Sequence, residues 1–151
     1  MINDIISPKE SDKDVERLLD KMDVEFEPEI VPVHFEPYAK LHNCYVNVEE
    51  KVKIDGGLIH YGWTIYKSDI LCEAERHAVW EAPNGDLIDI THSPIDFKEI
   101  MFVSDNRYVH PDQLVDNIRI NITNNSLVDD FIVICENLEK LYTYGDRKSV
   151  V

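Results

Sequence analysis

A tight turn between two strand-like segments constrains the fold of this chain more than any other feature. Apolar and polar residues alternate over 70–82, and a second strand-like segment, 86–91, begins after only Pro-Asn-Gly at 83–85. Proline at the second position of a type I turn, asparagine at the third, and glycine in a left-handed position form a three-residue hairpin loop. We therefore predict an antiparallel hairpin in which Ala82 pairs with Asp86.

The register of this hairpin decides which side chains share a face of the sheet. In the predicted register His77 stands opposite Thr91, and Asp89 lies on the same face as His77, one diagonal step away. A two-residue Asn-Gly turn would instead pair Trp80 with Asp89 and turn the aspartate to the opposite face. The proline favours the longer loop, so we predict a hydrogen bond between His77 and Asp89.

The rest of the sequence predicts a single α+β domain over residues 1–151. A strand at 58–66 precedes the hairpin, so three sequential antiparallel strands form a meander over about residues 58–91. We expect an antiparallel sheet, built on this meander, to pack against a helix that begins at Cys44 and against helices at both ends of the chain.

The remaining elements follow from periodicity, prolines and capping residues. They are a first helix from Ser7 to Met22 capped by Ser7, an extended connector or short edge strand within 24–37, a helix from Cys44 that ends before Asp55 with Asn43 as its N-cap, strands within 100–104 and 108–123, and a last helix from Leu127 to Tyr144 that stops at Gly145.

The composition restricts the classes of function. Hydrophobic residues make up 44% of the 151 positions, enough for a packed core. The formal net charge of -15, from 15 Lys and Arg against 30 Asp and Glu, disfavours binding to nucleic acid or to an acidic membrane. No apolar run is long enough to span a membrane and the N-terminus lacks a signal-peptide pattern, so we expect a cytoplasmic protein.

The three cysteines are expected to differ in role. Their odd number, without a signal-peptide pattern, disfavours a disulfide framework. No Cys-x-x-Cys pair occurs, which disfavours a structural zinc site of the usual spacing. Cys72 lies on the mainly apolar face of its strand and Cys135 on an apolar helical stripe, so both are expected in the core. Cys44 falls in the first turn of a predicted helix, where the helix N-terminus favours a negatively charged thiolate.

Cys44, His77 and Asp89 are the residue types of a nucleophile, a base and an orienting acid. Asp89 would fix the His77 ring and raise its basicity, and the ring would then take the proton of the Cys44 thiol. Backbone N–H groups of the first helical turn would stabilise an oxyanion. This chemistry requires no cofactor.

Two other interpretations stay open from the residues alone. Glu73 and Glu75 share the face of His77, so Glu75, His77 and either Asp89 or His92 are candidate ligands of a hydrolytic metal centre. The third interpretation is a non-catalytic acidic protein, of the kind a phage encodes, that binds or inhibits a basic host protein.

The run His-Ala-Val-Trp-Glu at 77–81 and the run Gly-Asp-Leu-Ile-Asp-Ile-Thr at 85–91 resemble the histidine and aspartate motifs of transglutaminase-like and other papain-like proteins. They also resemble uncharacterised bacterial and phage proteins in which a Gly-Trp strand precedes such a hairpin. The resemblance covers residues 42–92. It implies a papain-like core and a cysteine-dependent hydrolase or acyl transferase that attacks an amide or thioester bond of a protein or peptide-like substrate.

The resemblance also implies roles for individual residues. Cys44 corresponds to the nucleophile, His77 to the base and Asp89 to the orienting residue. Three further residues are expected to contact the substrate. Asn43 lies beside the nucleophile, Trp63 lies beside a glycine that permits close approach, and Glu75 lies on the face of the histidine.

Overall fold

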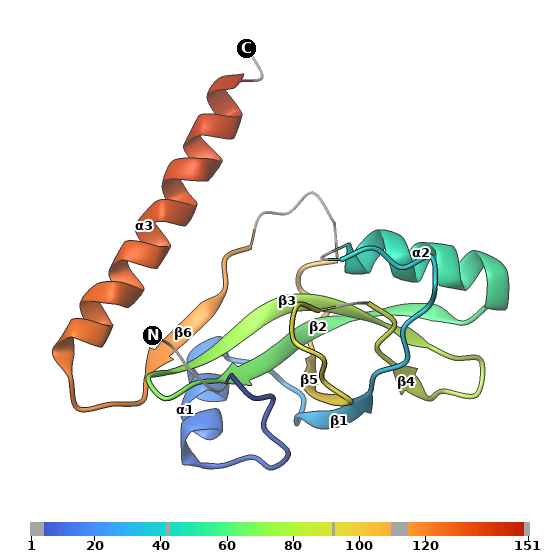
Figure 1. The fold of residues 1–151 in the computed structure, drawn as a ribbon, viewed down its shortest axis with the longest axis horizontal. Coiled ribbons are helices and arrows are strands. Elements are labelled where there is room, and N and C mark those ends of the chain that lie inside the picture. Colours follow the sequence, from blue (N-terminus) through green and yellow to red (C-terminus); the bar gives the residue numbers. More distant parts are fainter. Residues whose placement is uncertain (1–4, 42, 92, 110–114, 150–151) are drawn as a thin grey trace.

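The computed structural model describes residues 5–41, 43–91, 93–109 and 115–149, and of 143–149 only the backbone. The described residues form three helices and a six-stranded antiparallel sheet, which confirms the α+β class (Figure 1). The strand order is β1-β5-β2-β3-β4, and β6 pairs with another length of β3. The elements are α1 (Lys13–Met22), β1 (Glu29–Pro32), α2 (Cys44–Asp55), β2 (Leu58–Lys67), β3 (Leu71–Glu81), β4 (Leu87–Ile88), β5 (Glu99–Ser104), β6 (Ile118–Asn121) and α3 (Ser126–Ser149).

The predicted meander and hairpin register are both confirmed. β2, β3 and β4 are sequential antiparallel strands, and Trp80 pairs with Ile88. The Ala82 N–H donates to the Asp86 carbonyl at 2.8 Å, and Gly85 has a φ of 93°, as the three-residue loop requires. β1 is a short edge strand, as its prolines predict.

α1 and α2 pack against alternate residues of β3 that point to one face of the sheet. The two helices cover different ends of that face, and each buries its own apolar cluster. The cluster under α1 contains Val15, Leu18, Met22, Trp63, Ile65, Cys72, Ala74 and Met101, and the cluster under α2 contains Cys44, Val48, Ala78, Trp80 and Ile90.

The outer edge of β3 is paired at its two ends and, among the described residues, has no strand partner in its middle. β6 pairs with residues 71–74, and β4 pairs with residues 80–81. Beyond β4 the chain turns away from β3, and the Asp89 N–H donates to the Pro32 carbonyl of β1 at 2.9 Å. This leaves an open length of β3 that contains His77.

The first helix begins later than the sequence predicts. Asp12 caps α1, and its carboxylate accepts a hydrogen bond from the Val15 N–H at 2.9 Å. Ser7 was wrongly expected to be this cap. Its hydroxyl instead donates to the Ile65 carbonyl at 3.1 Å and accepts from the Met101 N–H at 2.8 Å, so it ties the N-terminal segment to the sheet.

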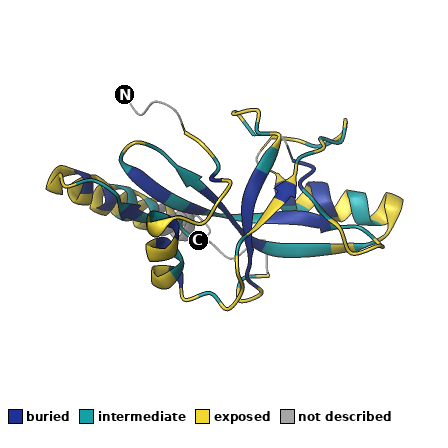
Figure 2. Cartoon of the chain, turned by 90° about the horizontal axis from the view of Figure 1, so that it is seen from below, coloured by how far each residue is buried: buried dark blue, intermediate teal, exposed yellow. Residues whose placement is uncertain are grey.

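The last helix also departs from the prediction. α3 continues through Gly145, and most of its described side chains, up to Tyr142, are exposed (Figure 2). Among its described side chains, Val128 and Ile132 are the buried ones, and they pack against Leu71. Cys135 was expected in the core but is partly exposed, because the body of the protein covers only the first turns of α3. No described helix is long and apolar enough to cross a membrane.

Candidate functional site

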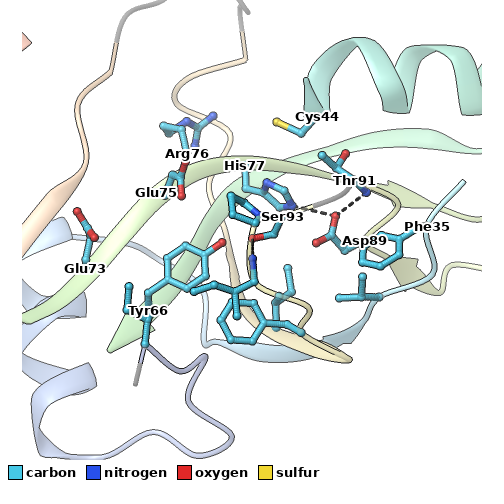
Figure 3. Close-up of a pocket in the computed structure, with 16 residues that line it drawn as sticks. Phe35, Cys44, Tyr66, Glu73, Glu75, Arg76, His77, Asp89, Thr91 and Ser93 are labelled. Carbon is cyan, nitrogen blue, oxygen red and sulfur yellow. Dashed lines mark hydrogen bonds and ion pairs between the residues drawn. The ribbon is translucent and has the colours of Figure 1, made fainter. Parts of the chain in front are cut away.

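Cys44, His77 and Asp89 line one cavity of about 380 Å³ (Figure 3). Cys44 is the first residue of α2, His77 lies in the open middle of β3, and Asp89 follows β4. The three side chains meet because β4 and β6 pair with different ends of β3 and leave the edge of β3 open between them. Through this opening Cys44, at the start of α2 on one face of the sheet, approaches His77, whose side chain points to the other face. The hairpin register alone could not place Cys44 here.

The predicted hydrogen bond between His77 and Asp89 is present. His77 Nε2 lies 3.0 Å from Asp89 Oδ1, and this oxygen also accepts from the Thr91 N–H at 3.2 Å. Asp89 is only 5% exposed. A carboxylate accepts hydrogen bonds, so Nε2 carries the hydrogen in the neutral ring and Nδ1 is left for a second partner.

The surroundings of His77 favour its charged form. Burial of the ring lowers the pKa of His77, but the charge and hydrogen bond of Asp89, together with an interaction with Cys44, raise this pKa well above 6.5. The side chain is 15% exposed, so solvent screens these interactions little. A charged imidazole beside a cysteine is the environment that stabilises a thiolate.

Asn47 is a positioning residue that the sequence analysis missed. It is buried one turn after Cys44 in α2, and its Nδ2 donates to Thr91 Oγ1 at 3.2 Å and to the Lys40 carbonyl at 2.8 Å. Its Oδ1 accepts from the Lys40 N–H at 2.9 Å. Asn47 thus links α2 to the segment that carries Asp89. An asparagine on the inward, apolar side of a helix was the available signal.

Glu75 lines the cavity as expected, on the same face as Glu73 and Tyr66. Glu73 Oε2 accepts from Arg119 Nε at 2.8 Å. Burial raises the pKa of Tyr66, and the charges of Glu75 and Asp89 raise it further, so its hydroxyl stays protonated. The apolar wall of the cavity consists of Val33, Phe35, Ile95, Phe97 and Ile100.

The expected substrate contacts at Trp63 and Asn43 are not supported. Trp63 is fully buried, and its indole N–H donates to Asp105 at 2.8 Å. The space beside it at Gly62 is filled by β5, since a Cβ there would lie 2.1 Å from the Val103 carbonyl oxygen. Asn43 holds the predicted N-cap position, but its side chain is exposed, makes no capping hydrogen bond and does not line the cavity.

A second chain of polar side chains crosses the sheet away from the cavity. Ser104 Oγ lies 2.7 Å from His60 Nε2, and His60 Nδ1 lies 3.3 Å from Glu81 Oε1. Serine, histidine and glutamate in this order can form a nucleophilic site. Here the Asp105 N–H, next to the serine, donates to the Tyr61 carbonyl at 3.0 Å and is not free to bind an oxyanion. We interpret this chain as a cross-strand network that stabilises the sheet.

The metal interpretation has no support from the part of the chain that the structure describes, where no three His, Cys, Asp or Glu side chains are placed to hold an ion. His92 lies outside the described residues. Cys72 is fully buried, and burial raises the pKa of its thiol to about 12, in agreement with the predicted core position.

No protein-family model, curated protein or solved structure matches the chain. The resemblance to transglutaminase-like and papain-like proteins therefore stays a prediction from residues 77–91.

Proposed function

We propose that the protein is a cysteine-dependent hydrolase or acyl transferase that acts on an amide or thioester bond. Cys44 is the nucleophile, His77 the base and Asp89 the orienting residue. The observation that supports this most is the meeting of the three side chains, from three separate elements, at one cavity. The 3.0 Å contact between His77 and Asp89 leaves Nδ1 of the ring available to Cys44.

In the proposed reaction the proton of the Cys44 thiol resides on His77 before the substrate binds, so that a thiolate lies beside a charged imidazole. The thiolate attacks the carbonyl carbon, a sulfur–carbon bond forms, and the electron pair of the carbonyl moves to oxygen. N–H groups of the first turn of α2, which have no acceptor within the helix, stabilise that oxyanion. The intermediate then expels an amine or thiol, which takes the proton from His77, and the acyl group stays on sulfur. Water or an amine next attacks this acyl group and gives a proton to His77, the sulfur–carbon bond breaks, and Cys44 leaves as the thiolate.

The lining of the cavity suggests how a protein or peptide-like substrate would bind. The apolar wall, which includes Phe35 and Phe97, suits the carbon chain of an acyl group. Glu75 and the protonated hydroxyl of Tyr66 provide polar contacts on the other side. Asp89 is 5% exposed and its Oδ1 accepts from both His77 and the Thr91 N–H, so its proposed role is to orient the ring.

Acylation by an activated ester tests this proposal without knowledge of the natural substrate. We expect p-nitrophenyl acetate to release nitrophenol with acetylation of Cys44, detected by peptide mass spectrometry. Cys44→Ala and His77→Asn should reduce the initial rate at least about 100-fold, the usual contribution of a positioned base.

Ser104→Ala is the matched control, because Ser104 contacts a histidine at 2.7 Å but lies outside the cavity. This variant should react at the wild-type rate. Acetylation of residues other than Cys44, or a Cys44→Ala protein that reacts as fast as the wild type, would refute the proposed function.

A further inference from the structure

The exposed side of α3 carries a continuous apolar stripe. The five side chains of this stripe, named the α3 stripe, are between 39% and 68% exposed. They follow one another at intervals of four, three, four and three residues. The members are Leu127, Phe131, Ile134, Leu138 and Leu141.

This alternating spacing is the a/d repeat of a coiled-coil seam. Phe131 and Leu138 take the a positions, and Leu127, Ile134 and Leu141 take the d positions. The two buried side chains, Val128 and Ile132, each come one residue after a member of the seam. Since successive residues of a helix are rotated by about 100°, both point to one side of the seam. Contact with the body through those two residues therefore leaves the α3 stripe uncovered.

The helix itself indicates that something covers the stripe. α3 is 24 residues long, and beyond its first turns it projects away from the sheet (Figure 1). Helices that lack tertiary packing are marginally stable in water, and most of the stability of a helix in a protein comes from burial of its apolar face. A packed seam would supply that burial.

We propose that two copies of this chain associate through their α3 stripes. A seam with strict a/d spacing is complementary to another helix with the same spacing, and a two-fold contact brings the same surface of each copy together. In an antiparallel pair of projecting α3 helices the two acidic bodies would lie at opposite ends of the seam, which limits the repulsion expected from a charge of -15 on each.

The distribution of charge along α3 fits a second copy better than a basic partner. The positions that flank a coiled-coil seam usually carry charges that select the partner. In α3 these flanking positions are mostly uncharged, with Cys135, Asn137 and Tyr142 among them, and Asp130 as the charged exception. Between Ser126 and Tyr142 the other charged residues lie outside the seam and its flanks, so over this length two copies meet without facing rows of like charge. They are Asp129, Glu136, Glu139 and Lys140.

Sedimentation equilibrium of the full chain tests the proposal, with two neighbouring substitutions as a matched pair. Ile134→Glu places a charge in the seam, and Val133→Glu places the same charge outside it. The two wild-type side chains are 56% and 52% exposed, so neither substitution disturbs the body of the protein. We expect the wild type and Val133→Glu to reach twice the 17.6 kDa mass of one chain, and Ile134→Glu to dimerise at least about tenfold more weakly.

Three results would overturn the proposal. One is a wild-type protein that has the mass of a single chain from about 1 to 100 µM, a range over which mass action should reveal the dimer. Another is a dimer that Ile134→Glu leaves intact. The third is equal dissociation by Val133→Glu and Ile134→Glu, which would mean that the seam has no special role.

Discussion

Replacing Asp89 with asparagine removes one charge from the site and little else. Asparagine has the same shape, and its Oδ1 can still accept the hydrogen bond from His77 Nε2 that spans 3.0 Å in the wild type. The loss of folding stability in Asp89→Asn therefore measures the electrostatic contribution of Asp89 by itself. Without that charge, burial, which lowers the pKa of His77, is opposed only by the hydrogen bond and by Cys44, so the pKa of His77 should fall.

The size of the effect on folding follows from the burial of the pair. Two unit charges about 4 Å apart attract by about 4 kcal/mol at an effective dielectric constant of 20. Breaking a buried pair typically costs about 3 to 5 kcal/mol. The side chains of His77 and Asp89 are 15% and 7% exposed, and the asparagine keeps the hydrogen bond, so we expect a loss of about 3 kcal/mol in the free energy of unfolding near pH 5.5.

The loss should depend on pH in a defined direction. In the wild type the folded pKa of His77 is raised, so its stabilisation is complete below pH 6.5 and is lost as the pH rises through the folded pKa. In Asp89→Asn the folded pKa of His77 is lower than in the wild type, so the variant has less of this stabilisation in mild acid. The difference in stability between the two proteins should therefore be greatest in mild acid and shrink with rising pH.

Two measurements check this prediction. Imidazole NMR titration gives the pKa of His77 in each protein, and urea denaturation at several pH values gives the free energies of unfolding. Asp86→Asn, in the exposed turn of the same hairpin, is the control and should change stability by less than about 0.5 kcal/mol. A His77 pKa below 6.5 in the wild type, or a stability loss that does not vary with pH, would refute the reasoning.

Two further substitutions test the surroundings of the site. Asn47→Ala leaves the polar groups of Lys40 and Thr91 without their hydrogen-bond partner. It should lower the free energy of unfolding, measured by urea denaturation, by about 2 kcal/mol and slow the reaction of Cys44. Asn43→Ala is the control and should do neither. Gly62→Ala places a Cβ 2.1 Å from a backbone oxygen that cannot move aside, so it should cost more than about 4 kcal/mol; a variant with the thermal midpoint of the wild type would contradict this.

The hairpin was predictable because its register depends on local chemistry. Pro83 and Gly85 select the loop, the loop fixes the pairing, and the pairing places Asp89 beside His77. The approach of Cys44 was not predictable in this way. It depends on β4 and β6 pairing with different ends of β3, which is a long-range outcome that no local pattern encodes.

The wrong expectations share a physical cause. An apolar periodicity shows that a face seeks burial, but it does not show what buries it. Cys135 was therefore assigned to the core from the apolar helical stripe on which it lies, although the body covers a different side of the helix at Val128 and Ile132. Gly62 likewise signalled a close approach, and the sequence could not tell that β5 makes that approach instead of a ligand.

Alkylation of the cysteines by iodoacetamide near neutral pH, followed peptide by peptide, tests the central claim most directly. Cys44 should react faster than the partly exposed Cys135, and Cys72 should stay unlabelled because its thiol pKa is about 12. His77→Asn should slow Cys44 at least about tenfold and leave Cys135 unchanged. Equal rates at Cys44 and Cys135, or a Cys44 rate that His77→Asn does not alter, would contradict the account of Cys44 as a nucleophile activated by His77.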